Sequence, residues 1–210
     1  MRKYYQTTFP VDRIVEVITH RGAHSLHNVC FAFRWGEDIF KRYDKEGQPL
    51  GFDSAQDLKS ALIAQAPDTI NVEFPEDARP LVFDVDIHDY ADIARLQCNC
   101  EPKQVCNVCW VQIMRPEMRK ARDFLCDFIG FDEVTFVFSG RKGFHIWVTD
   151  DCVWTWNTNA RLNYVQRMPV RCDVPITVCK KHLIKLPWTL HQKTKKLACV
   201  IENIDTWLPN

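Results

Sequence analysis

The chain lacks the sequence features that mark membrane proteins and chains of several domains. No apolar run approaches the roughly 20 residues of a membrane span, so we expect no membrane-spanning segment. The sequence also contains no internal repeat, no low-complexity tract and no linker rich in glycine and serine. With 46% hydrophobic and 12% aromatic residues, its 210 residues suffice for one sizeable core, and we expect a single intracellular globular domain over residues 1–210.

A net charge is also lacking, because 27 Lys and Arg balance 27 Asp and Glu, and this excludes a generally basic protein. One segment departs from the balance. From Arg161 to Lys196 there are nine Lys and Arg but a single acidic residue, Asp173. This segment therefore predicts a local anionic partner.

Four of the ten cysteines lie within twelve residues, in the pattern Cys98-x-Cys100-x5-Cys106-x2-Cys109. The spacing is typical of a closed tetrahedral zinc knuckle, in which four thiolates leave no position for water and the metal is structural. Two disulfides are the alternative, which the absence of a signal peptide after Met1 disfavours. The other six cysteines are scattered through apolar sequence, and we expect them to be buried thiols.

An acidic motif, D-x-D, follows the apolar residues 81–83. Side chains alternate along a strand, so Asp84 and Asp86 would share one face at a strand end. Two carboxylates in one space need compensating cations, and an oxygen-rich site favours Mg²⁺ or Mn²⁺, in a pair suited to phosphoryl transfer. The alternative is a solvated strand edge that runs into the acidic turn 88–90.

A glycine-bracketed turn, S-G-R-K-G, starts at Ser139 and joins two strand-like segments. Its two glycines would allow backbone N–H groups to approach an anion closely, and Arg141 and Lys142 add positive charge. His145 follows and could donate to a phosphate. The alternative is a hairpin tip without a ligand.

A third block contains Asp173, isolated among basic residues, and then Lys185 and His191. Asp173 could be a third metal-coordinating carboxylate, with the other two side chains on phosphates; alternatively, it forms a surface ion pair with Arg171. Together the three blocks predict nucleotidyl transfer. The carboxylates can hold divalent metals, and the glycine-bracketed turn and the basic side chains can bind a triphosphate.

The remaining pattern predicts an N-terminal helix, strands within residues 30–43, a helix over residues 54–65 with a cap at Asp53-Ser54, and a polar loop up to Pro80. A further helix is expected over residues 115–129, with Phe128 among its apolar positions. Because strands and helices do not alternate regularly, the pattern favours the α+β class with a mixed sheet.

The seven tryptophans suggest a base-stacking role, but most lie in apolar patterns. We expect Trp110, Trp147 and Trp188 to belong to the core. Trp154 and Trp156 lie in a less apolar stretch, and we expect them to be exposed if a neighbouring subdomain has been removed there.

In these blocks the sequence resembles the small catalytic subunit of archaeal and eukaryotic DNA primase, in the archaeo-eukaryotic primase superfamily. The similarity extends over most of the chain, from Y-Y-Q-T-T-F-P at Tyr4 through the D-x-D strand, the cysteine cluster and S-G-R-K-G-F-H to H-Q-K-T at His191. The resemblance implies a primase catalytic core with a zinc-binding loop at residues 98–109 embedded in it.

The resemblance also carries the family's site residues onto this chain. It implies that the catalytic Mg²⁺ or Mn²⁺ ions are held by Asp84, Asp86 and Asp173, that the triphosphate is bound by Ser139, Arg141, Lys142, His145, Lys185 and His191, and, by a looser match, that Asp57 lies near the ribose hydroxyl.

Two departures from the family stand out. An arginine that relatives place before the Phe-x-Phe pair is replaced by the stretch from Asn28 to Cys30, with Arg34 just beyond the pair. Relatives also insert a helical subdomain where this chain has only residues 149–170. The chain is then either a naturally compact form, such as a viral one, or an engineered core.

The resulting hypothesis is a DNA-directed RNA polymerase of the primase type, which joins NTPs into short RNA primers on single-stranded DNA. The alternatives are a stand-alone primase-polymerase of a virus or mobile element that also uses dNTPs, and a catalytically inactive, zinc-bearing nucleic-acid-binding module. The resemblance implies as partners a large primase subunit with an iron-sulfur cluster and a replicative DNA polymerase. It implies the nucleus for a cellular eukaryotic source, or the host cell's replication site for a viral one.

Overall fold

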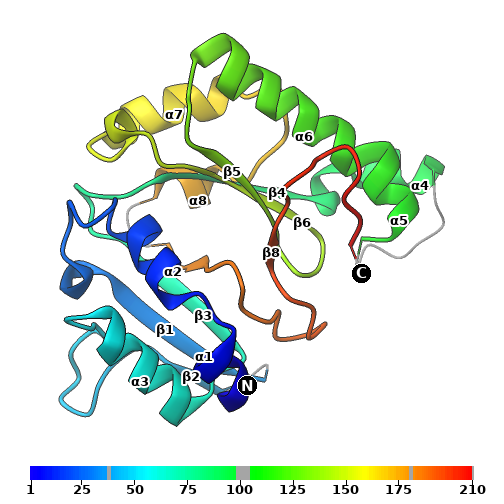
Figure 1. Cartoon of the computed structure of the whole chain (residues 1–210). Helices are drawn as coiled ribbons and strands as arrows, with labels where there is room; N and C mark the ends of the chain where they lie inside the picture. The colour runs from blue at the N-terminus through cyan, green and yellow to red at the C-terminus, as the bar shows by residue number, and fades with distance from the viewer. Residues whose placement is uncertain (37–38, 98–104, 180–181, 210) are drawn as a thin grey trace.

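Two antiparallel sheets organise the computed structural model, which describes residues 1–36, 39–97, 105–179 and 182–209 (Figure 1). Within these residues the strand orders are β2-β1-β3-β7 and β4-β6-β5-β8. The first sheet consists of β1 (Cys30–Trp35), β2 (Ile39–Lys41), β3 (Thr69–Glu73) and β7 (Ile184–Lys185), and the second of β4 (Leu81–Asp86), β6 (Gly143–Val148), β5 (Val134–Phe138) and β8 (Cys199–Val200). The expected α+β class is confirmed, but the strand pairs described are antiparallel rather than mixed.

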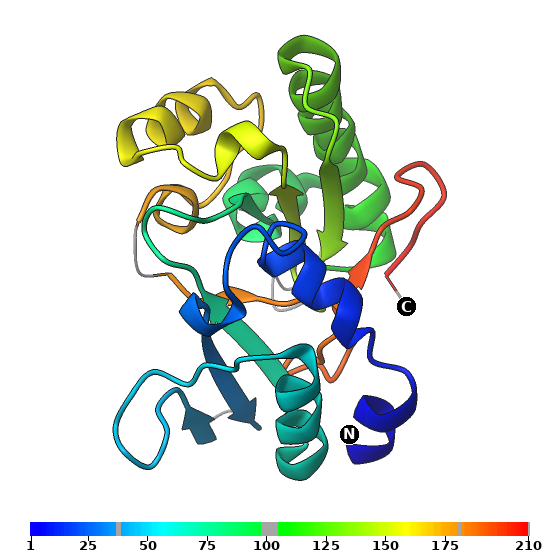
Figure 2. The ribbon, with the colours of Figure 1, turned by 60° about the vertical axis from the view of Figure 1, so that its left-hand side comes forward.

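Different helices cover the two sheets. Near the first sheet lie α1 (Arg2–Thr7), α2 (Val11–Ile18) and α3 (Ala55–Gln65), and a turn η1 (Leu26–Asn28) precedes β1 (Figure 2). The second sheet is covered by one continuous helical stretch made of α5 (Asn107–Cys109), η3 (Trp110–Met114), α6 (Arg115–Arg122) and η4 (Asp123–Ile129). Shorter elements complete the chain: η2 (Ile87–Tyr90), α4 (Ala91–Gln97), η5 (Asp151–Val153), α7 (Thr158–Arg167) and α8 (Val174–Val178). Among the described helices, none has the length and apolar character needed to cross a bilayer.

The second sheet separates two hydrophobic cores, because alternate residues of its strands face opposite sides. Phe83 and Val85 of β4 pack into the core beneath α6, whereas Val82 packs into the core shared with α2 and the first sheet. Asp84 and Asp86 follow Val82 at intervals of two residues, so their side chains face the first sheet. The period of β4 thus directs two carboxylates into the space between the sheets.

The expected polar loop before Pro80 is wrong, because it contains β3. Ile70 and Val72 are completely buried, and Phe74 is nearly so. The segment T-I-N-V-E alternates apolar and polar side chains, which is the pattern of a half-buried strand. It pairs with β1 and β7 and therefore lies inside the first sheet.

Phe128 is also not a core residue, since 76% of it is exposed. The helix over residues 115–129 is present, but its last part, η4, is π-helical. A π-helical turn holds more residues than an α-helical turn, so the α-helical spacing no longer predicts which face is buried. Phe128 stacks on Phe124 at the surface instead, with ring centroids 5.7 Å apart.

Residues 149–170 form an ordered part of the fold, containing η5 and α7. The expected exposure of Trp154 is wrong, because its ring stacks against His20 at 4.7 Å between centroids and is almost fully buried. Trp156 is half-buried against Tyr164 of α7. Trp110 and Trp147 lie in the core as expected, while Trp188 is half-buried.

The expectation that the scattered cysteines are buried holds only in part. Cys30, Cys126, Cys172 and Cys199 are half-buried, but Cys152 and Cys179 are exposed. Cys152 is the central residue of the one-turn η5, in which Val153 is the buried residue, and Cys179 follows the last residue of α8.

Candidate active site

Three carboxylates converge at the end of β4, on the face that looks toward the first sheet. Asp173 reaches this point from the start of α8, and its backbone N–H donates to the Asp84 carbonyl oxygen at 2.9 Å. The short helix is held on β4 by Thr177, whose Oγ1 donates to the Val82 carbonyl oxygen at 2.7 Å. Burial, and then repulsion from Asp86 and Asp173, raises the pKa of Asp84 to about 7. The structure therefore brings together carboxylates from two motifs that are far apart in the sequence.

Two contacts bear on the alternatives of a solvated strand edge at Asp86 and a surface ion pair between Asp173 and Arg171. Arg171 forms its ion pair with Asp92, at 3.0 Å from Nη1 to Oδ1. Asp86 accepts a hydrogen bond from the His88 backbone N–H at 2.9 Å and so caps η2. In the described part of the chain, no group of three or more His, Cys, Asp or Glu side chains is arranged to hold a metal ion. The carboxylates are thus electrostatic neighbours without an assembled coordination sphere.

The S-G-R-K-G turn is the loop between β5 and β6, and the carbonyl oxygens of all five of its residues accept hydrogen bonds. Two donors are side chains: Lys185 Nζ donates to Ser139 at 3.1 Å and Thr194 Oγ1 to Gly140 at 2.6 Å. Three are backbone N–H groups: Val105 donates to Arg141 at 2.9 Å, Ile87 to Lys142 at 3.2 Å and Ser139 to Gly143 at 3.0 Å. In a trans peptide the N–H points away from the C=O of the preceding residue. The N–H groups of the loop's three central residues therefore point away from these donors, an arrangement suited to binding an anion.

Both glycines of this loop are required by the space around them. Gly140 has φ +87°, and a Cβ there would lie 2.8 Å from the Cβ of His191. A Cβ on Gly143 would lie 1.8 Å from the Val85 carbonyl oxygen. The loop is thus packed directly on the third sequence block at one glycine and on the D-x-D strand at the other.

His191 lies at the centre of a group of positive charges. Its pKa is lowered to about 3, first by burial and then by Lys185, Arg141, Lys193 and Lys142. Its Nδ1 accepts hydrogen bonds from the backbone N–H groups of residues 193 and 194, at 3.1 and 3.5 Å. An accepting Nδ1 requires the proton of the neutral ring to be on Nε2, which is then available as a donor.

Lys185 and His145 connect the positive charges to the carboxylates. Burial lowers the pKa of Lys185 to about 7, while Asp84 opposes this shift. His145 lies opposite Asp84 in the β4–β6 register, with Nε2 3.6 Å from Asp84 Oδ1. Burial and the charge of Lys185 lower the pKa of His145 to about 3, so the ring is neutral.

The first sheet supplies the opposite wall of the site. Asn71 of β3 pairs in register with Lys185 of β7 and with Ala32 of β1, and directly paired residues share a face. Arg34, two residues beyond Ala32, lies on this face too, and its charge contributes to the lowered pKa of Lys185. A cavity of about 180 Å³ between the sheets is lined by Asn71, Val82, Asp84, His145, Ile176, Leu183, Ile184 and Lys185.

Asp57 is not brought into this cavity. It lies in the first turn of α3, where its backbone N–H donates to the side chain of Ser54 at 3.1 Å. The expected cap of this helix is therefore confirmed, and the capping interaction accounts for the aspartate. Asn71 is the polar residue that sequence reasoning missed; its signal was its place between Ile70 and Val72, opposite to their face in an alternating strand.

The cysteine cluster is described only in part, because Cys98 and Cys100 lie outside the described residues. Cys106 precedes α5, and its Sγ accepts a hydrogen bond from the Cys109 N–H at 3.4 Å. Cys109 is fully buried in the core beneath the second sheet. A C-x2-C turn of this kind directs both sulfur atoms to one side, which suits a tetrahedral site.

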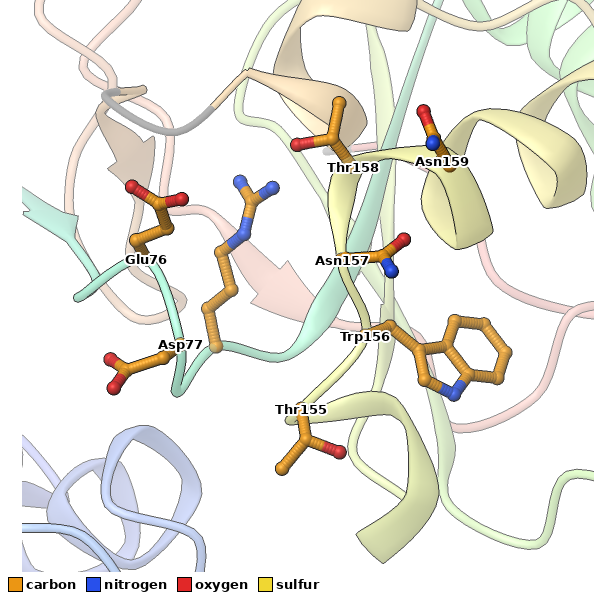
Figure 3. A pocket seen from close by; sticks show the side chains of 8 residues that line it. Glu76, Asp77, Thr155, Trp156, Asn157, Thr158 and Asn159 are labelled. Atoms are coloured by element: carbon orange, nitrogen blue, oxygen red, sulfur yellow. The ribbon is translucent and has the colours of Figure 1, made fainter.

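A larger pocket, of about 340 Å³, lies elsewhere between the segment after β3 and the start of α7 (Figure 3). Glu76 and Asp77 line one side of it, and Trp156 and Asn157 line the other. The residues that line it include neither the three carboxylates at the end of β4 nor the positively charged residues around His191. We therefore place the candidate site at the smaller cavity, where opposite charges and perturbed pKa values coincide.

The fold is similar to that of one polymerase domain of known structure. The polymerase domain of Mycobacterium tuberculosis ligase D, solved in complex with DNA, superimposes with a TM-score of 0.57, covering 95% of this chain and 79% of that domain. The two sequences are only 17% identical, so this likeness describes the fold.

The sequence comparisons define the class further. Residues 83–168 match the family model of the DNA primase small subunit. The DNA primase small subunit of Saccharomyces cerevisiae is 28% identical over 71% of this chain, and that of Schizosaccharomyces pombe is 27% identical over 77%. The resemblance inferred from the sequence is thus confirmed: the chain is similar to the DNA primase small subunit. It spans about two-fifths of the length of these relatives, 39% and 37%.

Proposed function

We propose that residues 1–210 form one catalytic domain that transfers nucleotides, as a DNA primase, from NTPs to the 3′ end of a short RNA on single-stranded DNA. One observation carries the proposal. The loop of S-G-R-K-G and the positive charges around His191 lie beside the carboxylates of Asp84, Asp86 and Asp173. Asp84, His145 and Lys185 line one cavity between the two sheets. Such a site has the charges to hold a triphosphate and the metal ions that activate it.

The carboxylates Asp84, Asp86 and Asp173 would hold Mg²⁺ or Mn²⁺. Their oxygen donors fit hard divalent cations, and the raised pKa of Asp84 indicates negative charge that lacks compensation. Asp86 accepts hydrogen bonds from the backbone N–H groups of His88 and Asp89, and a carboxylate keeps further lone pairs that it would offer to a metal ion. When bound, the metals would lower the pKa of the primer 3′-hydroxyl and neutralise charge on the triphosphate and pyrophosphate.

The remaining side chains would position and stabilise the phosphates. Arg141 and Lys142 lie next to the loop N–H groups, and Lys185 holds the loop through the Ser139 carbonyl while facing the cavity. His191, with its proton on Nε2, would donate to a phosphate oxygen, and neutral His145 would do so beside Asp84. Fixed charges in a partly dry cavity stabilise developing charge without reorganisation.

The partners are proposed from the family resemblance rather than from the site. They would be the DNA template, NTPs, a large primase subunit with an iron-sulfur cluster and a replicative DNA polymerase. The stand-alone primase-polymerase that also uses dNTPs stays a second candidate, because the fold is shared with the polymerase domain of a ligase. Comparing NTP with dNTP incorporation separates the two.

Nucleotide addition on a single-stranded DNA template, with Mg²⁺ or Mn²⁺, tests the proposal directly. The wild type is expected to extend a primer, and Lys185→Met or His191→Ala to raise the apparent nucleotide requirement about tenfold or more, because each removes a hydrogen bond to a charged phosphate. DNA affinity should be nearly unchanged in both variants, as measured by fluorescence anisotropy over a range of salt concentrations.

Lys196→Met is the matched control for Lys185→Met, because it removes a lysine from the same block outside the cavity. It should leave the nucleotide requirement unchanged and lower the slope of log affinity for DNA against log salt by about one unit. Normal nucleotide affinity and turnover in both Lys185→Met and His191→Ala would rule out this half of the site.

We further propose a structural zinc ion held by Cys98, Cys100, Cys106 and Cys109. Cys106→Ser should lower the zinc content and the thermal stability, because an empty site leaves the other thiols without the ion that organises them. Cys126→Ser, at a half-buried cysteine outside the cluster, should keep the zinc. Metal analysis of the wild type that finds less than about half an equivalent would contradict the closed four-ligand site.

A further inference from the structure

The loop that carries Arg141 and Lys142 is attached to the second half of the cysteine-rich stretch of residues 98–109. The Val105 backbone N–H donates to the Arg141 carbonyl oxygen at 2.9 Å. This bond joins positions 36 residues apart, since Val105 precedes α5 and Arg141 lies at the tip of the β5–β6 hairpin. The carbonyl of the neighbouring Lys142 is held by the Ile87 N–H from the other side, at 3.2 Å.

The same segment also packs against the base of the hairpin. The ring of Trp110, in η3, meets Phe138 edge to face at 5.5 Å and Phe144 at 6.4 Å between ring centroids. These two phenylalanines are the last residue of β5 and the second residue of β6, and they face each other across the hairpin. Trp110 is completely buried, so the contact is a packed part of the core.

From these contacts we infer that Val105 and Trp110 are positioning residues for the anion-binding loop, with the Val105 N–H setting the orientation of the Arg141 peptide. The inference rests on the proposed function, because it assigns the loop to the triphosphate. A peptide whose carbonyl is held inward must present the next N–H, that of Lys142, outward. Without the Val105 donor, this peptide can rotate, and the N–H and the two cationic side chains lose their common direction.

Reciprocal coupling follows from this arrangement. If the Val105 bond favours the triphosphate-binding form of the loop, a bound triphosphate must favour the Val105 bond by the same factor. The backbone at Val105, just before the helical stretch that begins at residue 107, would thereby respond to nucleotide. Cys109 and Trp110, at the start of that stretch, are buried and would change little.

Val105→Pro tests the inference, with Val105→Ala as its matched control. Proline removes the N–H donor, whereas alanine keeps it and removes only side-chain packing, since Val105 is a buried core residue. We expect Val105→Pro to weaken the affinity for ATP with Mn²⁺, measured by calorimetry, by about three- to tenfold relative to Val105→Ala, the factor for one net hydrogen bond. In kinetics this appears as a higher nucleotide KM with a smaller change in kcat.

Hydrogen exchange of the wild-type protein supplies a second measurement that needs no variant. The Val105 amide should exchange more slowly when ATP and Mn²⁺ are present, and amides in α3 should not change. Equal ATP affinity in the two Val105 variants, or unchanged Val105 exchange on saturation with ATP, would overturn the inference while leaving the proposed function intact. A wild type that binds no ATP would overturn both.

Discussion

Asp84→Asn is expected to abolish nucleotide addition and, at pH 8 without divalent metal, to make the folded protein more stable. The amide has the size of the carboxylate but cannot neutralise the charge of a metal ion. Losing several kcal/mol of transition-state stabilisation lowers the rate by about 10³-fold or more. Stability should rise because the substitution removes the charge that Asp86 and Asp173 repel.

The gain in stability should depend on pH. The pKa of Asp84 is raised from 3.8 to about 7 on folding, so its favourable contribution is complete below about 4 and is lost as the pH rises through 7. Asp84→Asn should thus exceed the wild type by about 1–3 kcal/mol at pH 8, and by little at pH 4. We take the modest range because 27% of the carboxylate side chain stays exposed and Lys185 offsets part of the repulsion.

Metal addition provides the matching control. Mn²⁺ should raise the melting temperature of the wild type, because the ion binds the folded state. It should leave the melting temperature of Asp84→Asn nearly unchanged. Asp57→Asn should behave as the wild type in activity and in the Mn²⁺ response, because Asp57 lies in the first turn of α3, away from the cavity, where its backbone N–H donates to the capping Ser54. Near wild-type incorporation by Asp84→Asn would show that the metal assignment is wrong.

Gly143→Ala is expected to cost about 3 kcal/mol or more of unfolding free energy and to remove activity, the largest stability effect that we expect from adding one methyl group. The new Cβ would lie 1.8 Å from the Val85 carbonyl oxygen and 2.9 Å from the Asp86 Cα, both backbone atoms. Neither atom can yield unless β4 and β6 separate, and they would separate where the carboxylates and the loop meet.

Gly47→Ala separates this clash from the general effect of replacing a glycine. Gly47 has φ +78° with open space around it, so alanine there should cost only the left-handed backbone strain, about 1 kcal/mol. Chemical denaturation compares the two variants. Equal loss in Gly143→Ala and Gly47→Ala would mean that the strand pair can widen, and that the close contact of loop and D-x-D strand does not hold the site.

Much of this site could be predicted because its signals are local. The alternation along residues 81–86 indicated that Asp84 and Asp86 share a face, and Asp53-Ser54 before an apolar periodic segment indicated a helix cap. The two glycines and two cations of the S-G-R-K-G turn predicted an anion-binding loop. Each of these statements concerns residues a few positions apart, whose geometry the backbone period decides.

Errors arose where a second element decides the environment. The segment before Pro80 was assigned to a polar loop, yet pairing with β1 and β7 buries part of it and brings Asn71 to the cavity. Trp154 was expected at the surface, but a stack with His20 from another part of the chain covers it. Phe128 followed the α-helical period that the π-helical η4 does not keep.

The sequence by itself determined which chemical groups this protein presents: a pair of carboxylates on one strand, a glycine-bracketed cationic turn and a lone aspartate in a basic block. Only the tertiary structure decided that they form one site. The Asp173 N–H meets the Asp84 carbonyl 89 residues away, and His191 packs on Gly140. Such contacts depend on how α8 and β7 pack against the second sheet, and a strand or helix period carries no information about the neighbour that will cover it.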